Sequence, residues 1–157
     1  CRIESRCYPI VCTPREVKTR PNTDYIMRFS LPYVVAMAAV KQKVGPAEID
    51  LKYAEDTKMQ ALMDKIQCVE DDSKRNPGFF PGYLTVTLND GRTFTADQRY
   101  EMGTAQNPLN MEAVSRKFSD NLEPFYSKAQ INRILECISS FEQLPDARSF
   151  LKLLVRA

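Results

Sequence analysis

The segment that most constrains the fold is a pair of short runs joined by a tight turn. Residues 83–88 (YLTVTL) and 92–96 (RTFTA) alternate in side-chain character and are rich in β-branched residues. Between them lies Asn89-Asp90-Gly91, in which glycine supplies the positive φ that a tight turn needs. The pattern predicts a β-hairpin, with Asp90 interpreted as a turn residue rather than a catalytic carboxylate.

A second strong signal is an apolar run that follows a capping serine. Ser30 is placed to cap a helix, and Pro32 suits its first turn. Residues 34–40 are apolar on every side, so we expect this helix to be buried and to end near Gly45-Pro46.

The regions on either side of this helix are less regular. Residues 2–7 and 8–13 favour strands, the second weakened by a proline. Residues 14–24 are polar and indicate a loop, with locally basic side chains at Arg15, Lys18 and Arg20. Either a solvated loop or a loop that faces an anion accounts for these cations.

Downstream, the pattern changes from mixed to helical. Residues 47–65 predict a second helical region, 65–70 a short strand, and 70–81 a loop broken at Pro77-Gly78 and Pro81-Gly82. After residue 110 the chain predicts only helices. The signals are a cap at Asn110 before an apolar stripe, a capping box from Ser127 to Gln130, and a last short helix near 150–154.

Composition excludes several classes of function. The 157 residues contain no histidine, which excludes a Ser-His-Asp or Cys-His site and histidine-ligated zinc within this chain. A net charge of +2 gives too little field to predict a nucleic acid or anionic membrane partner. The hairpin also lacks the stacking aromatics of a small RNA-binding domain. No apolar run reaches the ~20 residues of a membrane span.

The remaining motifs favour structural interpretations. The five cysteines show no C-x-x-C spacing, so we interpret them as reduced, mostly buried thiols of an intracellular protein. Asp71-Asp72 fits a solvated loop better than a cation site. Neither a P-loop nor a G-x-G-x-x-G motif is present, and we expect no cofactor and no metal.

The segment from Arg28 to Tyr33 combines a guanidinium, a hydroxyl and a phenol at a helix N-terminus. Such a terminus offers N–H groups and a dipole that attract anions, and an arginine fork matches a carboxylate. Tyr33 is placed to hydrogen-bond a substrate or relay a proton. The alternative, in which Ser30 is only a cap and Tyr33 only a core aromatic, stays open on the residues alone.

At this point the sequence resembles a known family. Residues 14–18 (PREVK), 20–23 (RPNT) and 29–36 (FSLPYVVA) look like the second domain of the MmgE/PrpD family, and the hairpin at 84–92 and the stretch 107–118 agree. The family contains 2-methylcitrate dehydratases, cis-aconitate decarboxylases and iminodisuccinate epimerases. The resemblance covers nearly the whole chain.

The resemblance implies an α+β fold: helices with an antiparallel, hairpin-containing sheet, followed by an all-helical C-terminal tail. Residues 1–110 would be the distal part of the α+β domain. Residues 111–157 would be a helical return that packs on an N-terminal helical domain missing from this chain. The catalytic His and Lys residues of the family would lie upstream of Cys1. Tyr33 matches a pocket tyrosine of the decarboxylase branch, and Ser30 and Arg28 are its neighbours in the segment.

The implied function is a cofactor-independent lyase that acts on a small polycarboxylate, by 2-methylcitrate dehydration or cis-aconitate decarboxylation. An epimerase, or a non-catalytic interaction or dimerisation module derived from the family, is the alternative. We also expect a homodimer in the cytoplasm, or in the mitochondrial matrix of a eukaryote, with no nucleic acid or membrane partner. The chain on its own is expected to be inactive.

Overall fold

The computed structural model describes residues 1–74 and 78–155, without the side chains of Glu16, Val17 and Lys74. The chain divides into two compact units, Cys1–Pro108 and Leu109–Ala157. The predicted break at Pro77-Gly78 lies partly outside the described residues.

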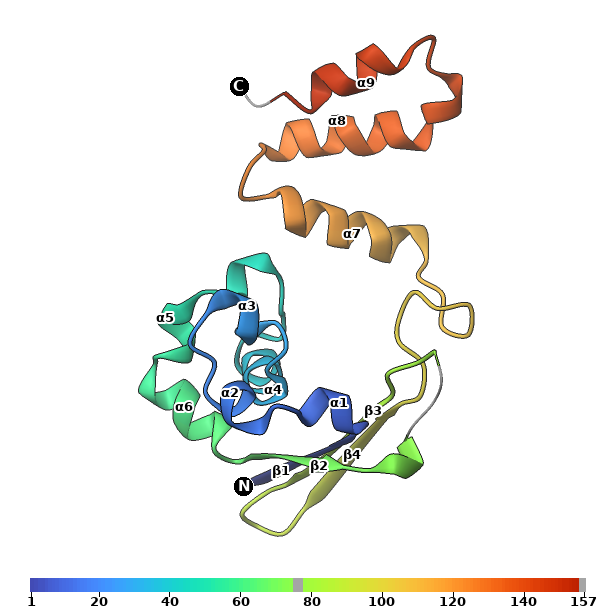
Figure 1. Cartoon of the computed structure of the whole chain (residues 1–157). Coiled ribbons are helices and arrows are strands. Elements are labelled where there is room, and N and C mark those ends of the chain that lie inside the picture. Colours follow the sequence, from blue (N-terminus) through green and yellow to red (C-terminus); the bar gives the residue numbers. More distant parts are fainter. Residues whose placement is uncertain (75–77, 156–157) are drawn as a thin grey trace. The chain divides into compact units, whose positions relative to one another are not determined.

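The first unit is built on a four-stranded sheet (Figure 1). Strand β1 (Arg2–Cys7) pairs in parallel with β2 (Ile66–Glu70) and antiparallel with β3 (Gly82–Thr87), and β3 pairs antiparallel with β4 (Thr93–Gln98). The predicted hairpin is confirmed, and Gly91 in its turn has a φ of 85°. The α+β class is also confirmed, although the sheet is mixed rather than purely antiparallel. The strands, in the spatial order β2-β1-β3-β4, are Ile66–Glu70, Arg2–Cys7, Gly82–Thr87 and Thr93–Gln98.

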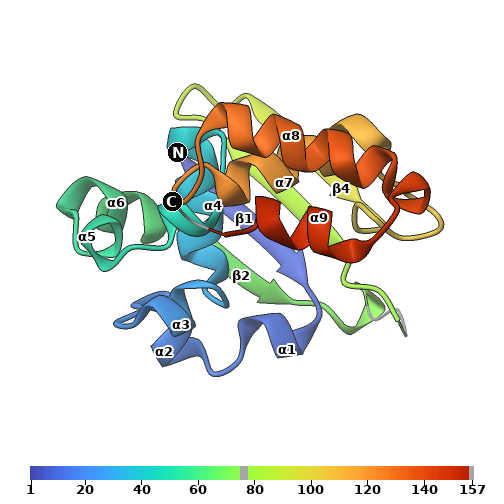
Figure 2. The same ribbon diagram turned by 90° about the horizontal axis from the view of Figure 1, so that it is seen from above.

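The helices of this unit lie on one face of the sheet (Figure 1). Two of them, α5 (Leu51–Ala54) and α6 (Thr57–Met63), lie side by side in both views (Figures 1 and 2). The helices are α1 Pro9–Cys12, α2 Arg15–Thr19, α3 Asp24–Met27, α4 Leu31–Lys41, α5 Leu51–Ala54 and α6 Thr57–Met63, with 3-10 turns at Pro46–Glu48 and Asp72–Lys74.

The core lies between these helices and the sheet because β1 alternates between its two faces. Its inward side chains, such as Ile3, are buried against α4 and α6 residues, and Met37 and Met63 there are almost fully covered. The opposite face of β1 is polar: Glu4 accepts hydrogen bonds from Arg2 at 2.8 Å and from Arg6 at 2.9 Å. This alternation fixes which face of the sheet the helices cover.

Two predictions for the N-terminal part are wrong. Residues 8–13 do not form a strand, because Pro9 occupies the first turn of α1, where its missing N–H costs nothing. Residues 14–24 are not loop throughout, since α2 forms within them. Its helical bonds are supplemented by the Thr19 hydroxyl, which donates to the Arg15 carbonyl oxygen at 2.8 Å.

The predicted helices of the middle part need smaller corrections. α4 ends at Lys41, before Gly45-Pro46, because Gln42 adopts a left-handed conformation with φ 56°. Its last turn is not buried, and Val40 is 56% exposed. Residues 47–65 break into a 3-10 turn and two helices because Asp50 and Asp56 each cap a new helix. The strand at 65–70 is confirmed as β2.

The second unit contains the predicted helices of the tail. Asn110, Ser127 and Asp146 accept hydrogen bonds from backbone N–H groups and cap the three α-helices. The capping box is only half formed, because the Gln130 side chain donates instead to the Leu153 and Val155 carbonyl oxygens. The helices are α7 Met111–Leu122, α8 Lys128–Ser139 and α9 Ala147–Leu153, with a 3-10 turn at Phe141–Gln143. Within the described ranges, no helix of either unit is long and apolar enough to cross a membrane.

Candidate functional site

Ser30 joins α4 to α2 through its hydroxyl group. Its Oγ accepts a hydrogen bond from the Tyr33 backbone N–H at 3.2 Å, which caps α4 as expected. The same hydroxyl donates to the carbonyl oxygen of Lys18 in α2, and the side chain is fully buried. Ser30 therefore fixes the start of α4 against α2, whereas its contact with a substrate stays a prediction.

Tyr33 lies one turn into α4, with its ring in the core and none of its surface exposed. Its hydroxyl donates to the backbone carbonyl oxygen of Glu48. Burial raises the pKa of Tyr33 to about 12, with smaller contributions from Tyr53 and Asp50. The phenol is thus neutral near pH 7, and its O–H group is already engaged in the hydrogen bond to the Glu48 carbonyl oxygen. A role in proton relay stays a prediction.

The first turn of α4 offers few backbone donors to an anion. Pro32 has no N–H, and the N–H groups of Tyr33 and Val34 are bound to the side-chain and main-chain oxygens of Ser30. An anion at this end of α4 would therefore depend on side chains rather than on the helix terminus.

Arg28 is the exposed member of the predicted trio. It follows α3 and lines a mostly apolar cavity of about 400 Å³ together with Ser30 and Lys18. Tyr33 does not line this cavity. The structure therefore brings Arg28 and Ser30 to one cavity and places Tyr33 in the core behind it.

A second cavity, of about 490 Å³, lies between α1, α2 and β2. Its lining combines two cations with thiol, hydroxyl and carboxylate groups. Those that bear on the chemistry are Cys12, Arg15, Lys18, Thr19, Cys68 and Glu70. Val11 and Lys18 line both cavities and so form the wall that they share.

The cations of the second cavity are held in different ways. Arg15 Nη2 lies 3.8 Å from Glu70 Oε1, and both side chains are partly exposed, so this ion pair is weak. Lys18 Nζ donates to the carbonyl oxygens of Ile10 at 2.9 Å and Val11 at 3.2 Å. These contacts account for two of the three ammonium donors. The α1 carbonyl oxygens therefore hold the Lys18 ammonium in place beside the cavity.

This arrangement suits the binding of a small anion. Arg15 offers a planar fork and Lys18 a point charge, and both match a carboxylate. Within residues 1–74 and 78–155, no three metal-ligating side chains come together in a group that could hold a metal ion. Asp71 and Asp72 are therefore not part of such a group. The chain also has no histidine to act as a base. The two cations of this cavity, Arg15 and Lys18, therefore support the binding of an anion.

Part of the lining of the second cavity was predictable from the sequence. Arg15 and Lys18, two cations of the predicted basic segment 14–24, line the cavity, and an anion facing them stays a prediction. Arg20 does not line the cavity, because it pairs with Asp64. Cys68 was not singled out, because its place in the cavity depends on the parallel pairing of β2 with β1, which no local pattern reports.

Comparison with known proteins agrees with this fold. Residues 1–143 match the model of the MmgE/PrpD C-terminal domain. The chain is 29% identical over 136 residues to the alkylcitrate dehydratase phiI of Talaromyces stipitatus, covering 80% of this chain. It is 22% identical over 136 residues to the cis-aconitate decarboxylase of Mus musculus, covering 85% of this chain. In each case the match spans 28% of the relative's length. The chain therefore belongs to the MmgE/PrpD family and corresponds to its C-terminal domain.

Proposed function

We propose that this chain is part of a lyase that acts on a small polycarboxylate, by dehydration or decarboxylation. The single observation that carries the proposal is the family match over residues 1–143. It is supported by the two relatives, one named a dehydratase and the other a decarboxylase, whose names both refer to citrate-type acids. The expected activity belongs to the full-length protein, because the chain spans only 28% of these relatives.

In the proposed reaction, a base removes a proton next to a carboxylate, or a carboxylate is lost as carbon dioxide. Both routes build enolate-like charge, which nearby cations stabilise. Because the chain has no histidine, the proposal assigns the base to residues outside it. Arg15, Lys18 and Arg28 are proposed to hold substrate carboxylates, since Arg15 lines the 490 Å³ cavity, Arg28 lines the 400 Å³ cavity and Lys18 lines both.

The roles of Ser30 and Tyr33 are part of the same proposal. Ser30 holds α4 to α2 by its bond to the Lys18 carbonyl oxygen. Tyr33 anchors α4 to the 3-10 turn at Glu48. Both are proposed to position the cationic wall, by which we mean Arg15, Lys18 and Arg28. We further propose that the Tyr33 phenol contacts the substrate directly.

The test is an assay of the full-length protein with 2-methylcitrate, cis-aconitate and related polycarboxylates. Product analysis separates dehydration, decarboxylation and epimerisation. Arg15→Gln is expected to raise KM by about tenfold with a smaller effect on kcat, because one charged hydrogen bond to the substrate is lost.

Arg20→Gln is the matched control, because Arg20 lies in the same segment and is paired with Asp64 away from the cavity. It is expected to leave KM unchanged. The absence of turnover on every polycarboxylate would overturn the lyase proposal. Equal KM values for the two variants would show that the cationic wall does not bind the substrate, and would leave the lyase proposal itself standing.

A second candidate function, a non-catalytic interaction or dimerisation module, is motivated by the second unit. Its helices carry apolar side chains at the surface, including Met111 at 69% and Leu151 at 58% exposed. This candidate predicts that the family's catalytic His and Lys positions are empty in the full-length sequence. Light scattering of the full-length protein would then report a dimer without turnover.

A further inference from the structure

Three cysteines from three elements lie close together beside the second cavity. Cys7 ends β1, Cys12 ends α1 and Cys68 lies on β2. The Sγ atoms of Cys7 and Cys12 are 3.2 Å apart, and both side chains are buried. Cys12 and Cys68 also line the cavity, whereas Cys7 lies behind Cys12 and does not.

We propose that Cys12 is a thiol modification site, reached through the 490 Å³ cavity, and that Cys7 converts the modified Cys12 into a Cys7–Cys12 disulfide. A disulfide needs a sulfur–sulfur distance of about 2.05 Å. The two sulfur atoms therefore have to move together by only about one ångström. Four residues separate the two cysteines, and the last three of them belong to α1, which is a single short helical turn.

The co-reactant is a small organic disulfide. The Cys12 thiolate attacks one of its sulfur atoms, the reagent's S–S bond breaks, and one thiol leaves as a mixed disulfide forms on Cys12. Cys7 then attacks the Cys12 sulfur, the second thiol leaves, and the new S–S bond closes. The two cysteine thiols are oxidised by two electrons, and the reagent is reduced to two thiols that carry the two protons.

Burial sets the resting state of the pair. Burial, together with the hydrogen bond to Cys12, raises the pKa of the Cys7 thiol far above its ordinary value, so that it stays protonated near neutral pH. The Cys7 thiol therefore has to lose its proton before it attacks Cys12, which slows the closure of the disulfide. Burial also raises the pKa of Cys68 to about 11, which disfavours this more open thiol as the site of attack.

The sequence provides a direct assay. Trypsin cleaves after Arg6 and Arg15 and releases Cys7 and Cys12 in one peptide, 7–15, whereas Cys68 falls in peptide 66–74. The folded full-length protein is incubated with 2-hydroxyethyl disulfide, quenched in acid, alkylated with iodoacetamide and digested. Peptide 7–15 is expected to be unalkylated and lighter by two hydrogen atoms, and a thiol reductant is expected to restore it.

Variants distinguish the two roles. Cys12→Ala is expected to remove the modification, and Cys7→Ala is expected to leave the mixed disulfide on Cys12. Cys137→Ala, in the second unit, is the matched control and is expected to leave the Cys7–Cys12 disulfide intact. The wild-type peptide map answers the question even where a variant does not fold. A peptide 7–15 alkylated at both cysteines, or one cross-linked to peptide 66–74, would overturn the proposal.

Discussion

The two units of the chain are stabilised in different ways. In the first unit, strands distant in sequence pair around a core in which Tyr33, Met27 and Met37 have no exposed surface. In the second, the buried residues among those that the structure describes are Ile131 and Ile134, both in α8, and none of them lies in α7 or α9. The second unit relies instead on helix caps, on the hydrogen bond from the Gln130 side chain to the Leu153 carbonyl oxygen, and on ring packing.

This difference separates two sources of stability in one chain. The first unit depends on apolar area removed from water between its layers. The second depends on groups near in sequence, such as the Phe141 and Phe150 rings, whose centroids are 5.3 Å apart. Substitutions in the two units should therefore differ in effect, and three substitutions, each with its own control, test the comparison.

The largest effect is expected from Met37→Ala. The side chain is fully buried in the core of the first unit, so its loss leaves a cavity and is expected to lower the free energy of unfolding by about 2–5 kcal/mol. Met111→Ala is the control in the second unit, because Met111 is 69% exposed, and its effect is expected to stay within about 0.5 kcal/mol. Urea unfolding of the two variants measures the difference. Similar losses would mean that the contrast in burial does not govern stability.

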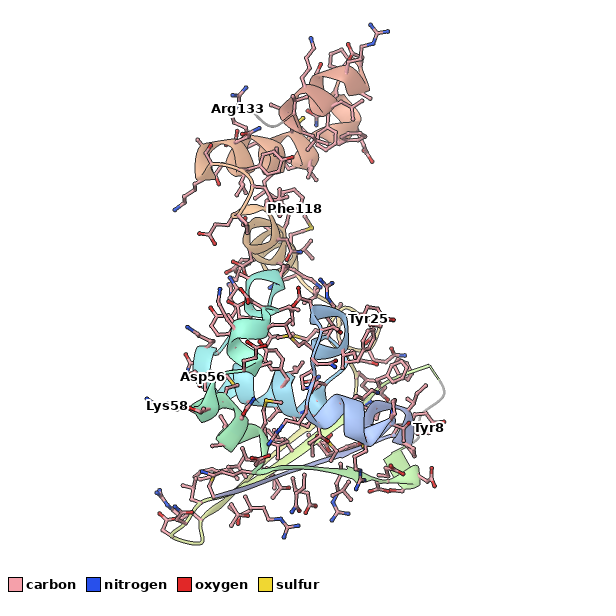
Figure 3. All side chains as sticks on the ribbon, turned by 60° about the vertical axis from the view of Figure 1, so that its left-hand side comes forward. Tyr8, Tyr25, Asp56, Lys58, Phe118 and Arg133 are labelled. Atoms are coloured by element: carbon pink, nitrogen blue, oxygen red, sulfur yellow. The ribbon has the colours of Figure 1, made fainter. Side chains whose placement is uncertain are left out.

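A smaller effect is expected from Tyr33→Phe. The substitution keeps the ring but leaves the Glu48 carbonyl oxygen without its donor, which is expected to cost about 1–3 kcal/mol. Tyr25→Phe is the control, because Tyr25 is 72% exposed on α3 (Figure 3). The Tyr33→Phe variant also tests the function of Tyr33 in the full-length protein. If kcat and KM are unchanged while stability falls, Tyr33 anchors α4 and takes no part in the reaction.

The smallest effect is expected from Asn110→Ala. It removes the side-chain oxygen that accepts the Ala113 N–H at 2.8 Å and caps α7, at a cost of about 1 kcal/mol. Arg116→Ala is the control, because its ion pair with Glu112 is exposed and is worth about 0.3–0.5 kcal/mol. Hydrogen exchange should show faster exchange in α7 and no change in the sheet of the first unit. Faster exchange in both units would show that they unfold together.

Features that depend on neighbouring residues were predictable from the sequence. The Asn89-Asp90-Gly91 turn determines its hairpin, and Ser30 and Asn110 cap the helices that were expected to follow them. Pro9 was misleading because its fixed φ suits both extended chain and a first helical turn, and only the tertiary structure selects the helix.

Features that depend on pairing between distant segments were not predictable. Nothing near Ile3 indicates that Ile66 lies beside it in a parallel ladder. The second cavity depends on this pairing, because it places Cys68 and Glu70 opposite α2. Arg15 and Lys18 could be recognised as a basic pair, but the sequence alone could not choose between solvent and a cavity for them.

The inner position of β1 also has a consequence for how the chain folds. β1 is synthesised before both of its partners, because β2 and β3 begin only at residues 66 and 82. Both of its hydrogen-bonding edges stay open during this interval, whereas β3 and β4 can zip together as soon as their turn is complete. The completion of the sheet, rather than the hairpin, should therefore limit the folding rate of the first unit.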